Sequence, residues 1–537
     1  MSAAPPPTRT ALPFSDAHGC KEWLAALPGT GGLQAQSQLL EALRAANGAV
    51  LDGLERLKCM ELLRDKIAFL QGEQRTRYFG KTLPLAAGDD AAWNVGRQLL
   101  EEMEGGYRKC VEASAAGGEL HRHAALISQR MVRYLGAQMM FHAAIYRRFD
   151  PQLWTRLHRL YTESEAAGIA EDNVKDSLQA EEAGSSVAEA YAQVVLAQAA
   201  YLSELTAAQM EFAEALLHIW ARKVRVRGES AEGSLPPMVH PLVVDFDKPI
   251  GARPLPPAQV SAHHRIVDVE QLSLSMRRRI HGLKNGEDPT TLKLPTSGGS
   301  VEALAQLQRL HRLWCEGAPV RPPARVPDEL GASVAFGAGA AWFFVTGGTR
   351  FEQPGQRREL TSQEKQDIEV FGQVSSRTQS MMVAEHSFTA EPWVVIDEML
   401  GAWRLLRPAG ATRGVAIGRL LAMRPGDTAP YFLGMVSALV QETDGRIVIT
   451  VTLFPGRPEP VAVRGADFSR SRSSTKWVEG FRLAALEKLR VPASLVLPTG
   501  IAAPGRGIEL WEDGVPKQAL VAEIVERGSD FDRVRLG

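Results

Sequence analysis

Side chains that could do chemistry are scattered through this sequence, and none falls into a recognised catalytic pattern. The chain contains no G-x-x-x-x-G-K-[ST], no G-x-S-x-G and no H-E-x-x-H. These patterns mark phosphate-binding loops, hydrolase nucleophiles and zinc proteases. His121 and His123 are two residues apart, so they point to different faces of a helix, whereas helical metal ligands favour a spacing of four. We therefore expect a non-enzymatic protein with no catalytic residue and no metal.

One basic cluster has the composition of an anion site. Arg277, Arg278, Arg279 and Lys284 follow one another closely, just before Gly286. Guanidinium groups can hold a phosphate with two parallel hydrogen bonds, so the cluster is an alternative anion site. A solvated or ion-paired helix face is the competing interpretation.

Composition limits the classes of partner. The 537 residues include 61 Lys and Arg against 62 Asp and Glu, a net charge of −1, so no overall field attracts a nucleic acid polymer. The four cysteines are far apart and form no C-x-x-C pair, which favours a reducing compartment. The sequence shows no signal peptide and no long apolar run. We expect a cytoplasmic protein without a membrane span.

The elements that must position any site begin with a helical domain, predicted over residues 1–226. Met60, Leu63, Ile67 and Leu70 recur at steps of three and four, which places them on one apolar face of a helix. Because such a face has to be covered, the pattern predicts several helices packed together.

Capping signals support this helical reading. Asp150 followed by Pro151 predicts the start of a helix, and Gly168 suits its left-handed end. Thr206 and Gln209 have the spacing of a capping box, in which each side chain bonds the backbone of the other residue. Two helix boundaries are therefore predicted from these residues.

Residues 227–330 are predicted to be a proline-rich linker with additional helices. Prolines remove backbone donors and interrupt the helical period here. Residues 239–246 form one short β-like run, and helices are expected over 269–283 and 301–314. His263 and His264 are expected at a loop-to-helix junction, as capping or solvated side chains.

Residues 331–537 are predicted to form an antiparallel β-barrel region. Residues 447–453 alternate apolar and polar side chains, and Asp444-Gly445 before them predicts a type I′ hairpin turn. Further strands are expected near 494–497, 507–511, 518–525 and 531–536, with a helix over 477–489. Short strands at this spacing indicate one small barrel or two. The fold class is α+β and multidomain, with a mainly α-helical N-terminal region and a C-terminal barrel region.

Residues 397–405, Asp-Glu-Met-Leu-Gly-Ala-Trp-Arg-Leu, resemble the strand motif of PilZ domains. These are six-stranded barrels that bind the bacterial second messenger cyclic di-GMP, and their motif reads Asp/Asn-x-Ser-x-x-Gly. Asp397 matches its first position, whereas Met399 and Ala402 stand where Ser and Gly are expected. A long helical region followed by such a segment resembles bacterial PilZ-containing proteins.

The resemblance implies cyclic di-GMP as the ligand, with Arg377, Asp397 and Arg404 as its binding residues. Arginine can grip guanine O6 and N7, stack on the base or neutralise a phosphate. PilZ domains supply an Arg-x-x-x-Arg clamp ahead of the barrel. Here Arg377 precedes the strand motif, but Met381 stands four positions later. Half of the clamp is therefore missing at this place.

Several functions fit these observations. One is a signalling protein that senses cyclic di-GMP and engages a protein partner through its helices; another is a scaffold whose degenerate barrel binds no nucleotide. Convergence of Arg377 and Asp397 on an open surface favours sensing, and burial of either in an internal salt bridge favours scaffolding. An enzyme requires acid, base or His side chains distant in sequence to meet in one cleft. The oligomeric state and the process regulated are not readable from the sequence.

Overall fold

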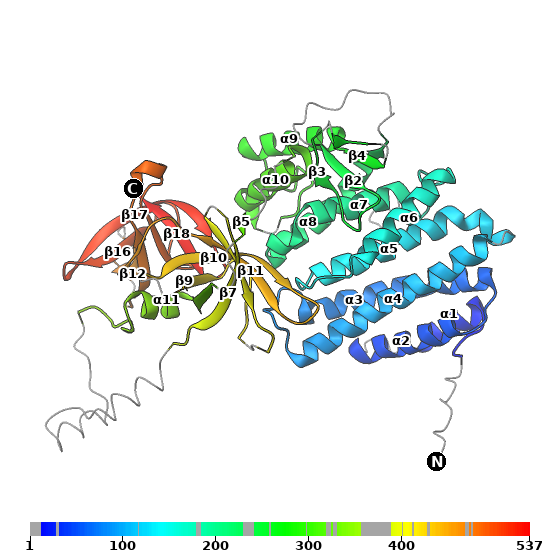
Figure 1. Cartoon of the computed structure of the whole chain (residues 1–537), viewed down its shortest axis with the longest axis horizontal. Coiled ribbons are helices and arrows are strands. Elements are labelled where there is room, and N and C mark those ends of the chain that lie inside the picture. Colours follow the sequence, from blue (N-terminus) through cyan, green and yellow to red (C-terminus); the bar gives the residue numbers. More distant parts are fainter. Residues whose placement is uncertain are drawn as a thin grey trace, which may run out of the picture. The chain divides into compact units, whose positions relative to one another are not determined.

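The computed structural model divides the chain into two compact units, Met1–Arg321 and Pro322–Gly537, and each is described by itself (Figure 1). The structure describes residues 12–27, 32–115, 118–178, 184–228, 241–256, 259–261, 263–296, 298–317, 324–325, 330–355, 388–399, 401–410, 413–426, 430–467, 472–473 and 476–537.

The first unit is mainly helical, as the apolar periodicity predicts. Met60, Leu63, Ile67 and Leu70 are all buried along one helix, which packs against its neighbours in the chain. The helices are α1 Ala17–Ala26, α2 Gly32–Gly48, α3 Gly53–Tyr78, α4 Ala87–Ala115, α5 Ala124–Ala143, α6 Gln152–Ala166, α7 Val187–Ala199, α8 Ala207–Trp220, α9 Glu270–Lys284 and α10 Gly299–Cys315, with 3₁₀ turns η1 Glu119–His123, η3 Leu202–Glu204 and η4 Ala221–Lys223.

The predicted helix ends are present, although α6 begins at Gln152 with Pro151 as its N-cap, one residue later than predicted. The Asp150 carboxylate accepts a hydrogen bond from the Gln152 backbone at 2.9 Å at the start of α6, and Gly168 takes a positive φ of 72° after its end. At α8, Thr206 and Gln209 form the reciprocal capping box. Both boundaries are confirmed.

A small antiparallel sheet completes the first unit. Its strands are β1 Arg225–Arg227, β2 Leu242–Asp245, β3 Arg253–Pro254 and β4 His264–Asp268, in the order β1-β4-β2-β3. Strand β2 confirms the β-like run predicted over 239–246. The loop-to-helix junction predicted at His263 and His264 is wrong, because His264 begins β4 and pairs with Asp245 of β2.

The second unit contains two closed antiparallel barrels, and six of the described strands form each of them. In the first barrel, β7 pairs with β6 and with β8, which closes the ring; β5 adds outside it on β7. The strands are β5 Ala324–Arg325, β6 Gly331–Phe336, β7 Glu391–Met399, β8 Ala402–Arg407, β9 Leu420–Pro425, β10 Phe432–Gln441 and β11 Ile447–Leu453, with helix α11 Ala338–Val345 after β6.

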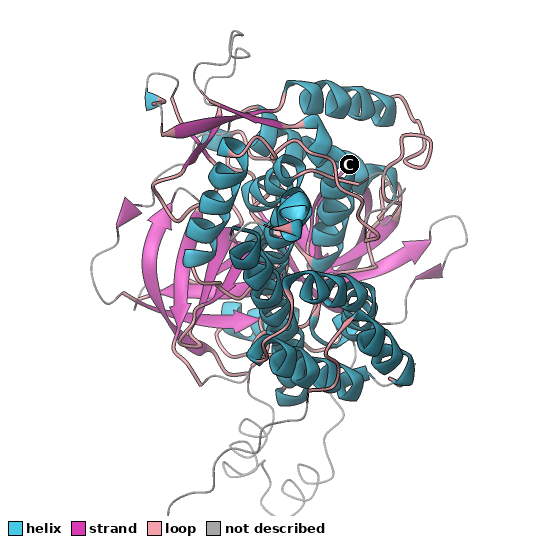
Figure 2. Cartoon of the chain, turned by 90° about the vertical axis from the view of Figure 1, so that its right-hand side faces the viewer, coloured by secondary structure: helices cyan, strands magenta, loops and turns pink. Residues whose placement is uncertain are grey.

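The second barrel closes in the same way, through pairing of β12 with both β14 and β16. Its strands are β12 Pro458–Asp467, β14 Val478–Leu483, β15 Ser494–Pro498, β16 Gly507–Glu512, β17 Val515–Arg527 and β18 Phe531–Leu536, with β13 Arg472–Ser473 beside β12 and a 3₁₀ turn η6 Glu487–Leu489. Figure 2 draws all strands of the chain in magenta and all helices in cyan. The predicted fold class, helical region followed by antiparallel barrels, is confirmed.

Two local predictions in this unit are wrong. The helix expected over 477–489 is strand β14 followed by η6, because Phe481 and Leu483 are both buried two residues apart, which is the period of a strand. The turn at Asp444-Gly445 is not type I′, since only Gly445 has a positive φ, at 84°. The Gly445 backbone donates to the Glu442 carbonyl at 3.0 Å instead.

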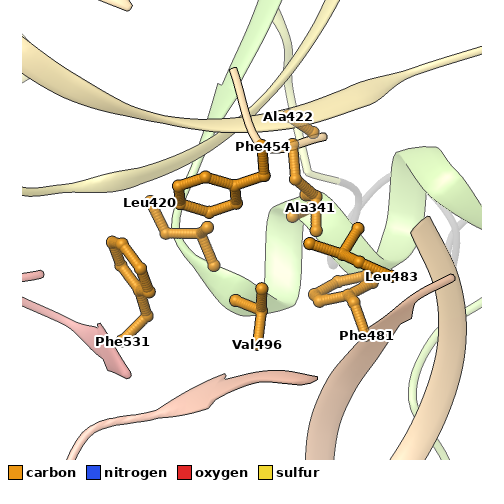
Figure 3. Packing of buried hydrophobic residues seen from close by; sticks show 9 residues of the cluster. Ala341, Leu420, Ala422, Phe454, Phe481, Leu483, Val496 and Phe531 are labelled. Carbon is orange, nitrogen blue, oxygen red and sulfur yellow. The ribbon is translucent and has the colours of Figure 1, made fainter. Parts of the chain in front are cut away.

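One hydrophobic core joins the two barrels (Figure 3). Leu420 of β9 and Phe454 after β11 come from the first barrel, and Phe481, Val496 and Phe531 from the second. The rings of Phe454 and Phe531 lie 5.3 Å apart. Because these side chains bury one another, the barrels stabilise each other.

Within the described part of the chain, no helix is both long enough and apolar enough to cross a membrane.

Candidate functional site

The strand motif lies in the hairpin of β7 and β8, where it forms an ion pair. Asp397 and Arg404 are register partners across the two strands. Arg404 Nη1 donates to Asp397 Oδ2 at 2.7 Å. Asp397 is 6% exposed, whereas the Arg404 side chain is 36% exposed. The structure therefore brings together two of the three predicted ligand residues, one buried and one reachable from solvent.

The other carboxylate oxygen of Asp397 lacks a hydrogen-bond donor. Oδ1 is buried and has no hydrogen-bond partner among the described residues. A buried acceptor without a donor destabilises a fold by about 1–3 kcal/mol, so this oxygen calls for an explanation. A ligand that presents N–H groups, as the guanine base does, has the chemistry that this atom lacks.

Strand β5 runs beside the motif and carries an arginine that the sequence reasoning missed. Arg325 is the register partner of Asp397 on the other side of β7. Arg321 stands four positions before it in the sequence, so the two have the Arg-x-x-x-Arg spacing, ahead of the first barrel. The sequence signal for this arginine pair is its spacing within a proline cluster, which lies far from Asp397 along the chain.

The structure describes part of the remaining motif. Arg377 and Met381 lie outside the described residues. Met399 pairs with Ala402 at the end of the hairpin, and Gly401 between them takes a positive φ of 77°. The glycine that this tight turn requires therefore stands one position before the place where the PilZ motif has it.

The alternative anion cluster lies on α9, and its members differ in their contacts and exposure. Arg279 is tied to its own unit: Nε donates to the Leu292 carbonyl at 2.9 Å, and the guanidinium lies 5.6 Å from the Trp220 ring centroid. Arg277, Arg278 and Lys284 are exposed. No described cavity gathers the four cations, so this cluster remains a prediction.

The histidine pairs give no metal site in the part of the chain that the structure describes. His264 lies 3.7 Å from a carboxylate oxygen of Asp245, and His263 lies 3.6 Å from one of Asp247. These are two separate pairs, each with too few ligands for a metal ion.

The sequence reasoning also missed a buried ionic network inside the helical unit. Asp176, whose side chain is 1% exposed, lies among three arginines. Arg64 Nη2 donates to its Oδ1 at 2.6 Å, and Oδ2 lies 3.5 Å from Arg130 Nη1 and from Arg133 Nε. Burial alone would raise the pKa of Asp176, but Arg64 and then Arg130 and Arg133 outweigh it and lower the pKa to about 2.

A second carboxylate completes the network. Glu61 accepts hydrogen bonds from Arg130 Nε and Nη2, both at 2.9 Å, and from the Tyr107 hydroxyl at 2.5 Å. Such two-point contacts between arginine and carboxylate are the strongest ion pairs in proteins. Glu61 therefore pairs mainly with Arg130, and Arg64 Nη1 also lies 3.4 Å from its Oε2.

The comparisons with known proteins bear on the helical unit. Residues 18–231 match the family model described as Cyclic-di-GMP receptor FimW, N-terminal domain. No curated protein matches the chain. The resemblance to a cyclic di-GMP receptor with a large helical N-terminal region, inferred from residues of the first barrel, is confirmed by this match.

Proposed function

We propose that this chain is a non-enzymatic cytoplasmic receptor for cyclic di-GMP, which it binds on the first barrel beside β7. The observation that carries the proposal is the match of residues 18–231 to a receptor domain, joined in one chain to a barrel whose PilZ-like strand lies against an arginine-bearing segment. The helical unit would relay the signal to a protein partner.

The binding residues proposed are Arg321, Arg325, Asp397 and Arg404. Arginine in the clamp would contact guanine O6 and N7 or a phosphate, and the orphan Oδ1 of Asp397 would accept from the N–H edge of a guanine. The Arg404 guanidinium is partly exposed and already held by Asp397, and it would contact a second anionic or carbonyl group of the ligand. Met399 and Ala402 contribute no polar group, so the arginines would supply most of the affinity.

Calorimetric titration of the full chain with cyclic di-GMP tests this function. We expect saturable heat, and an affinity at least about tenfold weaker in Arg325→Ala, because a charged hydrogen-bonding partner of the ligand is lost. Arg277→Ala, a matched arginine from the α9 cluster, should leave the affinity unchanged. Cyclic di-AMP, whose adenine lacks the O6 acceptor, should bind more weakly.

Three other results would change the proposal. An affinity that falls in Arg377→Ala but not in Arg325→Ala would assign the clamp to the segment before the motif. A fall only in Arg277→Ala would move the site to α9. No heat at high ligand concentration would contradict nucleotide binding altogether.

The second candidate function is a scaffold that binds no nucleotide. It is favoured by the burial of Asp397 in an ion pair with Arg404, since a carboxylate already engaged within the barrel has less capacity for a ligand. In this case the helical unit alone would provide the interaction surface.

A further inference from the structure

The helical unit contains a cavity of about 330 Å³ that is formed by residues of this unit alone. It lies among α3, α4, α5, α7 and α8, within the residues that match the receptor domain. Leu178, which is 43% exposed, forms part of its lining, so the cavity reaches solvent there. Its volume falls at the lower end of the range for small-molecule sites.

Small side chains on three helices leave this space open. Ala68 of α3, Ala137 of α5, and Ala190 and Ala197 of α7 all line the cavity. Protein interiors are normally close-packed, and an unfilled cavity lowers stability in proportion to its volume. Larger apolar residues at these positions would fill the space. The alanines therefore keep open a cavity whose cost in stability a bound molecule would offset.

The body of the cavity is apolar on all sides. Each of the five helices contributes at least one large apolar side chain, namely Ile67 of α3, Leu100 of α4, Met140 of α5, Val194 of α7 and Leu217 of α8. The apolar surface of a ligand would leave water on packing against these side chains, which favours binding.

The charged side chains of the wall are engaged within the protein. Arg64 Nη2 donates to Asp176 Oδ1 at 2.6 Å, and its Nη1 lies 3.4 Å from a Glu61 carboxylate oxygen. At another place on the wall, Arg75 Nη2 donates to Glu214 Oε2 at 2.7 Å. Both carboxylates that line the cavity are therefore paired with arginines.

The third arginine of the wall, Arg133, has partners as well. Its Nη1 donates to Gln193 Oε1 at 2.6 Å and its Nη2 to Ser185 Oγ at 3.1 Å, and its Nε lies 3.5 Å from Asp176 Oδ2. An ion that entered the cavity would lose its hydration without finding a free counter-charge, which is unfavourable. The wall therefore selects against ligands that carry a charge of either sign.

We propose that this cavity binds a small uncharged organic molecule with a mainly apolar body, which packs against Ile67, Met140 and Val194. A concave apolar site with a few polar groups is the usual form of a small-molecule site, and here the polar groups exclude ions because they are already paired. This ligand differs from the cyclic dinucleotide, which carries two phosphates, so the helical unit would receive a second chemical signal.

Calorimetric titration of the full chain with octanol tests the proposal. Octanoate and octylammonium have the same chain length and carry a negative and a positive charge at neutral pH. Below the micellar range of both ions, we expect octanol to bind at least about tenfold more tightly than either, because neither ion finds a free counter-charge in the cavity. This comparison uses the unaltered protein and therefore does not depend on the folding of any variant.

Two variants then locate the site. Ala137→Phe, which fills the cavity from α5, should abolish octanol binding, and Ala68→Leu, which narrows it from α3, should weaken binding by about tenfold or more. Ala305→Phe is the matched control and should bind octanol as the wild type does, because Ala305 is an exposed residue of α10 that does not line the cavity. Circular dichroism would establish that each variant is folded.

The opposing results are equally specific. Octanoate or octylammonium that binds as tightly as octanol, or more tightly, would overturn the uncharged ligand class. Octanol binding that survives in folded Ala137→Phe, or no octanol binding to the unaltered chain, would overturn the cavity as a site. Cyclic di-GMP binding is measured separately, so failure here leaves the receptor function standing.

Discussion

Replacing Asp176 by asparagine is expected to lower the free energy of unfolding of the helical unit by about 3–5 kcal/mol. The reason is that Asp176 is the carboxylate shared by Arg64, Arg130 and Arg133, which are all largely buried. The variant keeps the size of the side chain but leaves these cations without it. Urea unfolding of the full chain, followed by hydrogen–deuterium exchange of peptides from α3 and α5, would measure the loss in this unit separately.

The pH dependence of the same variant gives an independent check. The pKa of Asp176 is lowered in the folded protein from 3.8 to about 2, so its stabilising effect is complete above pH 3.8 and is lost as the pH falls through about 2. The stability gap between wild type and Asp176→Asn should therefore be constant near neutrality and narrow below about pH 4. Asp172→Asn, an exposed neighbour, should show no gap. A loss below about 1 kcal/mol in Asp176→Asn would contradict the structural role of the network.

The helices can be predicted well from the sequence because the features that determine them are local. The apolar spacing at Met60, Leu63 and Ile67 and the capping box at Thr206 and Gln209 act within one or two turns, and the structure contains both. Strand β14 was missed for the same reason. Its residues 478–483 become a strand by pairing with β12 and β15, which is a tertiary effect that overrides local preference.

The candidate site and the buried ionic network are harder to predict, because their residues lie far apart along the chain. Asp176 lies 112 residues from Arg64, so no spacing rule could join them. The register of Arg325 against Asp397 depends on where β5 docks on β7, and barrel closure depends on pairing that skips along the chain. By contrast, Asp397 and Arg404 pair within one hairpin, so their pairing can be predicted from the local sequence.

Replacing Phe531 by alanine is expected to destabilise both barrels together, by about 3–5 kcal/mol. Phe531 belongs to β18 of the second barrel, is fully buried, and lies with its ring 5.3 Å from that of Phe454. The same cluster includes Leu420 and Leu433 of the first barrel, so the cavity left by the ring would be lined by residues of both (Figure 3). A shared core predicts one cooperative unfolding transition for the two barrels.

Hydrogen–deuterium exchange under increasing urea would follow this transition in peptides from β9 and β10 and from β15 and β18. In Phe531→Ala the midpoints of both sets should fall by the same amount, since neither barrel can keep its side of the core intact. Phe388→Ala is the matched control in the same unit: this side chain is 41% exposed, so its removal should change stability by less than about 1 kcal/mol. A midpoint that falls in β15 and β18 alone would mean that the two barrels fold independently and that the core between them transmits no stability.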